Sequence, residues 1–295
     1  MLRILNKQEF IIKGSDVEII KNMKKVVKYI PIITDRFVRI FFLVRLTLVT
    51  RISIILNTFA ALTINLFRKK KIIRYFGQSF IYEYWSDPLT FLAYPPEISS
   101  AILNQVDQDS INNVLDIGGN VGQFSVTFVN MGKPKQIDIF EPNGKIFEIL
   151  ENNTKPYKSI KLYNYGVGNL GERKFYFKAG KSATGSILKE NAFTEIEELD
   201  EINIRLINDV SKITGRKTYD LVKVDVEGFE SEVIKNLKGV KTKYLLIEVS
   251  SNREKNYSTS ELYTQIMKTF GNFEIIYQDP TDRETNSYNV LLEFK

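Results

Sequence analysis

The chain has 295 residues, of which 43% are hydrophobic and 26% charged, enough to bury the core of one large domain or two smaller ones. It contains no cysteine, which excludes disulfides and thiolate metal sites and favours a reducing compartment, so we expect a cytoplasmic protein. It also contains no histidine, which excludes mechanisms that pair histidine with a serine or cysteine nucleophile. Acid–base chemistry must therefore rely on Asp, Glu, Lys or Tyr.

The formal net charge of +6 and the pI of about 9.1 are typical of proteins that bind nucleic acid or anionic lipid. Much of the excess lies before residue 75, in Lys21, Lys24, Lys25, Lys28, the arginines between 36 and 51, and the run RKKK at 68–71. The sequence thus indicates a basic, apolar, helical N-terminal region, residues 1–94, followed by a globular domain over residues 95–295.

Residues 37–67 form a long apolar stretch whose longest charge-free part, residues 52–67, is shorter than the roughly 20 residues of a membrane span. On a helical wheel one side collects Arg36, Arg39, Thr47, Thr50, Arg51, Asn57, Thr58 and Asn65, whereas Arg45 and Thr63 lie opposite. Three interpretations stay open: peripheral contact of residues 36–71 with an anionic membrane surface, a helical hairpin packed on the next domain or on a second subunit of a homodimer, and a true span.

Aromatic residues are dense between residues 72 and 95. Tyr82, Tyr84, Trp85 and Tyr94 could line the mouth of a substrate site, because aromatic faces stack on sugars. The alternative is a hinge packed between the two regions.

Short apolar strands alternate with amphipathic helices from residue 97 onwards. The expected strands cover residues 114–118, 136–140, 160–167, 173–177, 219–226, 243–250, 273–278 and 289–295. The expected helices cover residues 96–106, 122–132, 142–153, 229–239 and 258–271, with Gly132 ending the second and Ser258 or Ser260 capping the last. This order predicts an α/β fold: a doubly wound, mainly parallel sheet that ends in an antiparallel hairpin.

The first strand runs into a glycine turn, VLDIGGNVGQFS, at the edge of the sheet where such folds bind ligands. Gly118, Gly119 and Gly122 permit positive φ and close approach of a ligand to the backbone. A dinucleotide turn would carry glycine where Asn120 stands, and Asp116 would repel a pyrophosphate. Because a carboxylate is favourable beside an ammonium or a sulfonium, the turn favours S-adenosylmethionine.

Glu141 ends the second strand, where a carboxylate can accept hydrogen bonds from both hydroxyls of a ribose. NAD also carries such a ribose, so this residue supports a nucleoside without separating the two cofactors. A turn that only packs helix on sheet would leave both Asp116 and Glu141 unexplained.

The segments LDIGGNVGQFS, IDIFEPNGKIFEILENN, LVKVDVEGFESEVIKNLKG and YLLIEVS, in this order, resemble the FkbM-type S-adenosylmethionine-dependent methyltransferases over roughly residues 95–295. KVDVEGFE is the most specific of these, since class I methyltransferases share the others. The resemblance implies a Rossmann-like seven-stranded sheet and O-methylation of a hydroxyl on a sugar, a glycan or glycolipid, or a related metabolite.

Carried over by position, Asp116, Gly118, Gly119, Asn120 and Gly122 would surround the methionine part of the cofactor. Glu141 would bind the ribose with Asn143 at its edge, and residues 165–167, ending at Val167, would lie near adenine. The acidic residue that many class I enzymes use near adenine is not evident in this sequence.

The candidates for deprotonating the acceptor are Asp225 and Glu227, two apart at the end of one strand, and Glu248 at the end of the next. Asp225 and Glu227 would share a face if the strand continued that far, and paired carboxylates can raise one pKa. The trio could instead hold a hard metal ion. In a third interpretation Asp225 contacts the cofactor's ammonium and Glu227 caps the helix that starts near Phe229, whereas Lys223 points elsewhere and is structural.

Other classes of protein remain as alternatives: an NAD-dependent or nucleotide-sugar enzyme on a similar fold, and a non-catalytic, membrane-associated binding protein. Nucleic-acid methylation is not expected, because DVEG stands where amino-methylating enzymes of this fold carry a motif of the NPPY type. The expected partner is a small-molecule or glycan acceptor, and no resident metal is expected.

Overall fold

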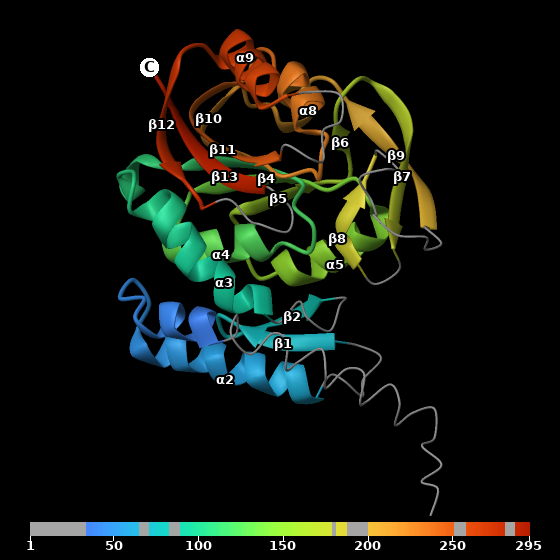
Figure 1. Ribbon diagram of the computed structural model, residues 1–295. Coiled ribbons are helices and arrows are strands. Elements are labelled where there is room, and N and C mark those ends of the chain that lie inside the picture. Colours follow the sequence, from blue (N-terminus) through green and yellow to red (C-terminus); the bar gives the residue numbers. More distant parts are fainter. Residues whose placement is uncertain are drawn as a thin grey trace, which may run out of the picture.

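A seven-stranded sheet forms the centre of the protein in the computed structural model, which describes residues 34–64, 71–82, 89–178, 181–187, 200–250, 258–280 and 287–295 (Figure 1). The strand order is β12-β13-β11-β10-β3-β4-β5. The strands are β3 (Asn113–Ile117), β4 (Gln136–Phe140), β5 (Ile160–Tyr163), β10 (Thr218–Val224), β11 (Lys241–Ser250), β12 (Phe273–Gln278) and β13 (Ser287–Phe294). The pairs from β11 to β5 are parallel, and β13 runs antiparallel to both β11 and β12. The predicted parallel sheet with an antiparallel closing hairpin is confirmed.

Helices cover both faces of this sheet. Adjacent strand residues point to opposite sides and therefore pack against different helices. Leu221 packs with α4 (Gln123–Gly132) and α5 (Gly144–Thr154) on one face. Its neighbour Val222 packs with α8 (Glu230–Asn236) and α9 (Thr259–Phe270) on the other. The short helix α7 (Val210–Thr214), which precedes β10, was not predicted.

The end of α4 differs from the prediction, whereas the start of α9 agrees with it. The residue in left-handed conformation after α4 is Lys133, whereas Gly132 is helical and faces the ring of Phe128, which a Cβ would approach at 3.0 Å. Ser258 caps α9 as predicted, in a capping box with Glu261.

A second sheet, which the sequence did not predict as a separate layer, lies beside the first. Its order is β6-β9-β7-β8, from strands β6 (Gly166–Val167), β7 (Gly171–Lys178), β8 (Lys181–Ser186) and β9 (Asp200–Ile207). The chain between β5 and β10 therefore forms a wall at the edge of the main sheet. The strand expected over residues 173–177, on an edge or in a hairpin, is part of β7, which pairs antiparallel with β8.

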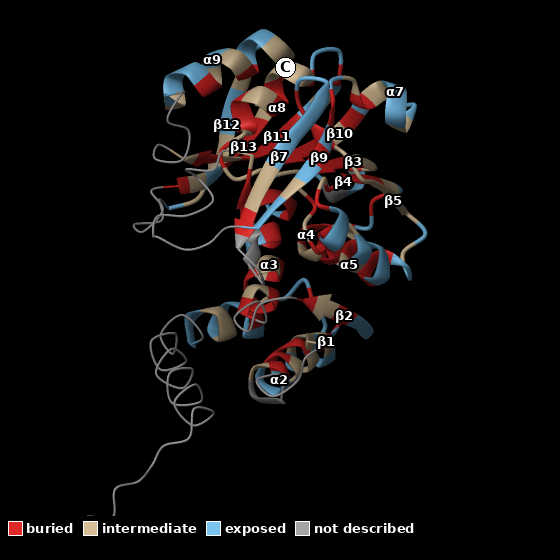
Figure 2. Cartoon of the chain, turned by 90° about the vertical axis from the view of Figure 1, so that its right-hand side faces the viewer, coloured by how far each residue is buried: buried red, intermediate tan, exposed pale blue. Residues whose placement is uncertain are grey.

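The N-terminal region contains a helix over residues 34–41, α2 (Leu48–Ile64) and a hairpin of β1 (Lys71–Tyr75) with β2 (Gln78–Tyr82) (Figure 2). The hairpin was not predicted, and Tyr82 is buried in the core instead of lining a substrate mouth. Tyr84 and Trp85 lie outside the described residues. No helix among the described residues is long and apolar enough to cross a membrane.

The two predicted regions share one hydrophobic core. Helix α3 (Thr90–Ile98), which continues as a π-helix over Ser99–Leu103, crosses the expected boundary at residues 94–95. Ile54 of α2 and Tyr75 of β1 belong to the same buried cluster as the residues of the sheet. The hydroxyl group of Tyr75 lies 2.7 Å from Thr127 Oγ1 of α4, which ties the hairpin to the main fold.

Candidate functional site

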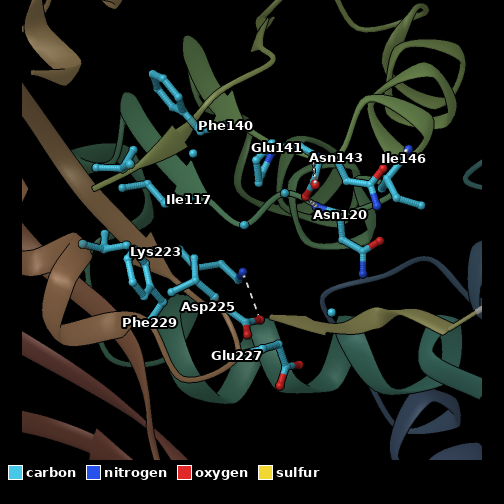
Figure 3. Close-up of a pocket in the computed structure, with 18 of the residues that line it drawn as sticks. Ile117, Asn120, Phe140, Glu141, Asn143, Ile146, Lys223, Asp225, Glu227 and Phe229 are labelled. Carbon is cyan, nitrogen blue, oxygen red and sulfur yellow. Dashed lines mark hydrogen bonds and ion pairs between the residues drawn. The ribbon is translucent and has the colours of Figure 1, made fainter. Parts of the chain in front are cut away.

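A cavity opens at the carboxyl ends of β3, β4 and β10, where the strand order reverses (Figure 3). Such a switch point is where ligands bind in doubly wound folds. The cavity is lined by six residues that were predicted only as cofactor contacts: Gly118, Gly119, Asn120, Glu141, Asn143 and Val167. Asp225 and Glu227 line it too, whereas Asp116, Gly122 and Glu248 do not.

Glu141, at the end of β4, is 6% exposed and is held in place by two backbone amides. Its Oε2 accepts a hydrogen bond from Asn120 N and its Oε1 accepts one from Asn143 N, both at 2.9 Å. A carboxylate has about four acceptor positions, so each oxygen keeps capacity for one more donor. Burial raises the pKa of this carboxyl to about 7, and the two amide hydrogen bonds act against burial.

Asn143 combines two functions at the start of α5. Its Oδ1 caps the helix by accepting from Lys145 N at 3.1 Å. Its Nδ2 is buried in the cavity wall without a hydrogen-bond partner. An unsatisfied buried donor is costly, so it indicates a ligand acceptor at this place. The predicted helix start is thereby refined: Asn143, which follows Pro142, is the capping residue.

Lys223 stands between two carboxyl groups, which corrects the prediction that it points elsewhere as a structural residue. Its ammonium lies 3.4 Å from Asp116 Oδ1 and 3.1 Å from Asp225 Oδ2, with 8% of the side chain exposed. The ammonium also lies 5.3 Å from the centre of the Phe124 ring, within the range of a cation–π contact. Figure 3 shows it directed toward Asp225 in the cavity.

Asp116 is fully buried behind this lysine. Its Oδ2 accepts a hydrogen bond of 2.6 Å from Ser125 Oγ, so its partners belong to the protein itself. Burial raises the pKa of Asp116, while Lys223 and Ser125 oppose that shift. Burial alone would lower the pKa of Lys223, but Asp225 and Asp116 outweigh it and keep that pKa above the ordinary range. The carboxylate that reaches the cavity is Asp225, whose side chain is 35% exposed.

Close packing against neighbouring elements requires glycine at two positions of the turn, independently of the cavity. A Cβ on Gly118, where φ is +84°, would lie 1.9 Å from the carbonyl oxygen of Asp225. A Cβ on Gly122, where φ is +90°, would meet Leu150 of α5 at 2.9 Å. Gly118 therefore brings β3 and the end of β10 together, and Gly122 packs α4 on α5 outside the cavity wall.

The segment after β10 differs from both predictions made for it. The strand ends at Val224 and Glu227 has a φ of +55°, so Asp225 and Glu227 do not share a strand face. Glu227 does not cap α8 either, because Phe229 occupies the capping position without a side-chain hydrogen bond. Glu230 was not predicted as a site residue; its Oε1 accepts from Val226 N and Gly228 N, both at 3.1 Å. Glu230 fixes the loop that carries Asp225 and Glu227.

A smaller cavity adjoins the first and is polar at its far end. Tyr94, Phe124, Lys223 and Asp225 line both cavities, and Glu97, Asp279 and Asn289 line only the second. Glu248 lines neither cavity. Within the described part of the chain, no group of three Asp or Glu side chains is arranged to hold a metal ion, so the predicted alternative of a carboxylate trio is not assembled there.

Sequence reasoning also missed the residues that the second sheet and α8 bring to the cavity. Phe175, Gly185 and Ile187 form a wall from the second sheet, and Phe229 stands before α8. Their only signal in the sequence was the expected strand over residues 173–177. That strand could not be assigned to a cavity wall without its partners β8 and β9.

The profile of the Methyltransferase FkbM domain matches residues 116–274, more than half of the chain. The chain belongs to the FkbM methyltransferase family. It is a methyltransferase with a Rossmann-like class I fold, and S-adenosylmethionine is its methyl donor.

One relative is the 2-O-methyltransferase NoeI of Sinorhizobium fredii, which is 23% identical over 180 residues, 57% of this chain and 74% of that protein. Among solved structures, magnesium protoporphyrin IX methyltransferase from Synechocystis PCC 6803 has a TM-score of 0.43 and 11% identity, with 70% of this chain and 82% of that chain covered. Fibrillarin from Aeropyrum pernix has a TM-score of 0.41 and 13% identity, with 76% and 82% covered. Because these scores are below 0.5, the fold assignment rests on the strand order and the family match.

Proposed function

We propose that this FkbM-family enzyme transfers the methyl group of S-adenosylmethionine to a hydroxyl oxygen of a sugar, a glycan or glycolipid, or a related small molecule. The observation that carries the proposal is one cavity with two differently equipped ends. Glu141 and Asn143 provide nucleoside contacts at one end, and Lys223 with Asp225 provides charged groups at the other. The relative named as a 2-O-methyltransferase supports oxygen as the accepting atom.

The buried donor of Asn143 and the free acceptor capacity of Glu141 fit the ribose of the cofactor. The carboxylate would accept from the two ribose hydroxyls and Asn143 Nδ2 would donate to a ribose oxygen. Residues 165–167 and Phe229 offer an apolar wall for the purine. Asp225 would face the cationic end of the cofactor, the contact that the sequence analysis assigned to both Asp116 and Asp225.

The cofactor supplies an electrophilic methyl group when it is bound, and the protein's main task is alignment of the acceptor oxygen. Correct orientation of two reactants contributes up to about 7–11 kcal/mol in well-oriented systems. The wall shared by the two cavities, Tyr94 and Phe124, gives an acceptor ring an aromatic surface to stack on. Glu97, Asp279 and Asn289 provide hydrogen-bond partners for its remaining hydroxyls.

Asp225 is the residue we assign to the hydroxyl group that accepts the methyl. Its Oδ2 is held by Lys223 at 3.1 Å, which orients the carboxylate so that the other oxygen can accept the hydroxyl proton. Glu227 lines the same cavity and is the alternative acceptor of this proton. Removal of the charge from each residue separates the two assignments.

The test is incubation of the full chain with methyl-labelled S-adenosylmethionine and separate glycolipid, polysaccharide, protein and nucleic-acid fractions. We expect label in a glycolipid or polysaccharide fraction, released as an O-methyl sugar on hydrolysis. Asp225→Asn should lose turnover by about 10²–10⁴-fold, the usual contribution of a placed base, while Glu227→Gln retains most of it. Label confined to protein or nucleic acid would contradict the acceptor class, and full turnover in Asp225→Asn would remove that residue from the mechanism.

A further inference from the structure

Exposed apolar side chains are concentrated in the N-terminal region. Of the fourteen large hydrophobic side chains that are exposed among the described residues, ten lie between residues 38 and 72. The most exposed are Val44 at 87%, Val49 at 78% and Phe42 at 70%. Exposed apolar side chains concentrated in one region in this way are typical of an interaction site.

Helix α2 turns its apolar residues to the solvent on one side. Leu48, Ile52 and Leu56 are four residues apart, so they line one face, and all three are exposed. The opposite face is buried and includes Ile54 and Thr58, whose hydroxyl donates to Ile54 O at 2.8 Å. The polar stripe predicted from the sequence is therefore partly in the core, and an apolar stripe is outside.

We define the N-terminal apolar face as the exposed residues of this region before and within α2. They are Val38, Phe41, Phe42, Val44, Leu48, Val49, Ile52 and Leu56. Figures 1 and 2 show α2 at the end of the molecule away from α8 and α9, so a partner on this face would not contact the helices on the far side of the sheet.

The N-terminal part of the sequence has a net positive charge, whereas the remainder has a net negative charge. Residues 1–75 contain 16 basic and 4 acidic residues, a net charge of +12. Since the whole chain has 41 basic and 35 acidic residues, residues 76–295 have 25 and 31, a net charge of −6. Arg51 donates to the backbone carbonyl of Phe41, a contact that does not neutralise its positive charge.

We infer that the N-terminal apolar face binds an anionic lipid surface. An apolar helix face with cations around it inserts at the boundary of headgroups and acyl chains, where each cation near the surface adds to the attraction. A second copy of the chain would bring two faces of the same sign together, since the described residues 34–64 and 71–75 contain six basic residues and one acidic residue, and this opposes association through this face. Residues 1–33, with seven basic and three acidic residues, have the same sign and do not supply the complementary charge.

The experiment is flotation of the full chain with vesicles of phosphatidylcholine, with and without about 30% phosphatidylserine. We expect binding to the anionic vesicles that is about tenfold stronger than to the neutral ones and that decreases with added salt. The variant Phe42→Ser/Val44→Ser/Val49→Ser/Leu56→Asn should lose this binding. A matched control is Leu170→Ser/Met267→Ser/Ile275→Ser, which alters exposed apolar residues of the catalytic part and should float as the wild type does.

A second variant, Arg68→Gln/Lys69→Gln/Lys70→Gln, changes only charge and should weaken binding to the anionic vesicles. S-adenosylhomocysteine affinity, measured in every variant, reports whether the fold and the methyltransferase site are intact. Wild-type protein that fails to float, or equal flotation of the wild type and the apolar variant, would overturn the inference. It would also be overturned if the apolar variant changed a dimer to a monomer in light scattering while the wild type did not bind vesicles.

Discussion

Lys223 on β10 lies beside Asp116 on β3 in the parallel register of the two strands, and its ammonium is 3.4 Å from Asp116 Oδ1. The same ammonium reaches Asp225 at the end of β10. One buried cation thus links the buried carboxyl group of Asp116 to the carboxylate of Asp225 in the cavity wall. These ion pairs, together with the backbone of the turn itself, hold the glycine turn after β3 in position.

Replacement of this cation, Lys223→Met, should destabilise the fold by about 3–5 kcal/mol, because it leaves the fully buried Asp116 without its cationic partner. The loss should be larger at pH 8 than at pH 5. Without the ammonium, the pKa of Asp116 in the folded state lies still further above its unfolded value, so stability is lost as pH rises. Urea unfolding at both pH values measures the effect.

The double variant Asp116→Asn/Lys223→Met should recover more than half of that loss, since no buried carboxyl group then lacks a cation. Lys212→Met is the matched control: Lys212 lies 3.5 Å from Asp209 in an exposed pair, and its loss should cost less than about 1 kcal/mol. If the double variant were no more stable than Lys223→Met alone, Asp116 would not be the group that requires the ammonium.

Glu141 should make both stability and ligand affinity depend on pH near neutrality. Burial raises the pKa of this carboxyl from 4.5 to about 7. The folded state therefore holds the proton more tightly, and stability should fall by about 3 kcal/mol as pH rises from the unfolded value to the folded one. Ribose hydroxyls donate to the ionised carboxylate, so the affinity for S-adenosylhomocysteine should rise with pH through about 7, with release of a proton on binding below it.

Calorimetric titration in two buffers of different ionisation enthalpy measures the number of protons released when S-adenosylhomocysteine binds. Glu141→Gln should bind S-adenosylhomocysteine more weakly at pH 8, with little change in affinity between pH 6 and 8. The absence of histidine and cysteine removes the side chains that ordinarily titrate in this range. Identical proton release by the wild type and Glu141→Gln would assign the titration to another group.

The sheet could be predicted because its strands are apolar and separated by helices with regular patterns. The N-terminal hairpin and the second sheet were missed because their strands obtain their burial from distant partners. Gln78 and Ser79 of β2 are exposed, for example, whereas Phe80 packs against Tyr75 and Phe91 of other elements. Burial of this kind depends on tertiary contacts that no local pattern contains.

In the site, sequence alone placed the residues at strand ends but not the direction of their side chains. Asp116 and Glu141 each lie at or near a strand end, yet only Glu141 reaches the cavity, because Lys223 from the next strand covers Asp116. The family motif contains Lys223 and Glu230, and their functions follow only from the ion pairs and the loop amides seen in the structure.

Asn143 offers a test that separates its capping function from its contact with the cofactor. Asn143→Ala should lose about 1 kcal/mol of stability as a cap and about tenfold in S-adenosylhomocysteine affinity as a donor. Asn143→Ser keeps a capping oxygen but removes the amide donor and adds no charge beside Glu141, so affinity should fall while most of the capping stability is retained. Asp209→Ala removes the cap of α7 away from the cavity and should change stability alone. Wild-type affinity in Asn143→Ser would contradict the assigned donor.

Glu230 should affect turnover more than cofactor binding, because it holds the loop of Asp225 and Glu227 without lining the cavity. Glu230→Ala leaves the amides of Val226 and Gly228 without their acceptor, at a cost of about 1–3 kcal/mol for each buried donor. We expect kcat to fall about tenfold or more with a smaller change in S-adenosylhomocysteine affinity, since misplacement of a group that contacts the substrate weakens alignment. Glu230→Gln keeps an oxygen acceptor and should restore most of kcat, whereas Glu232→Ala on the same helix should leave kcat unchanged. Equal kcat in Glu230→Ala and the wild type would show that the loop keeps its geometry without this carboxylate.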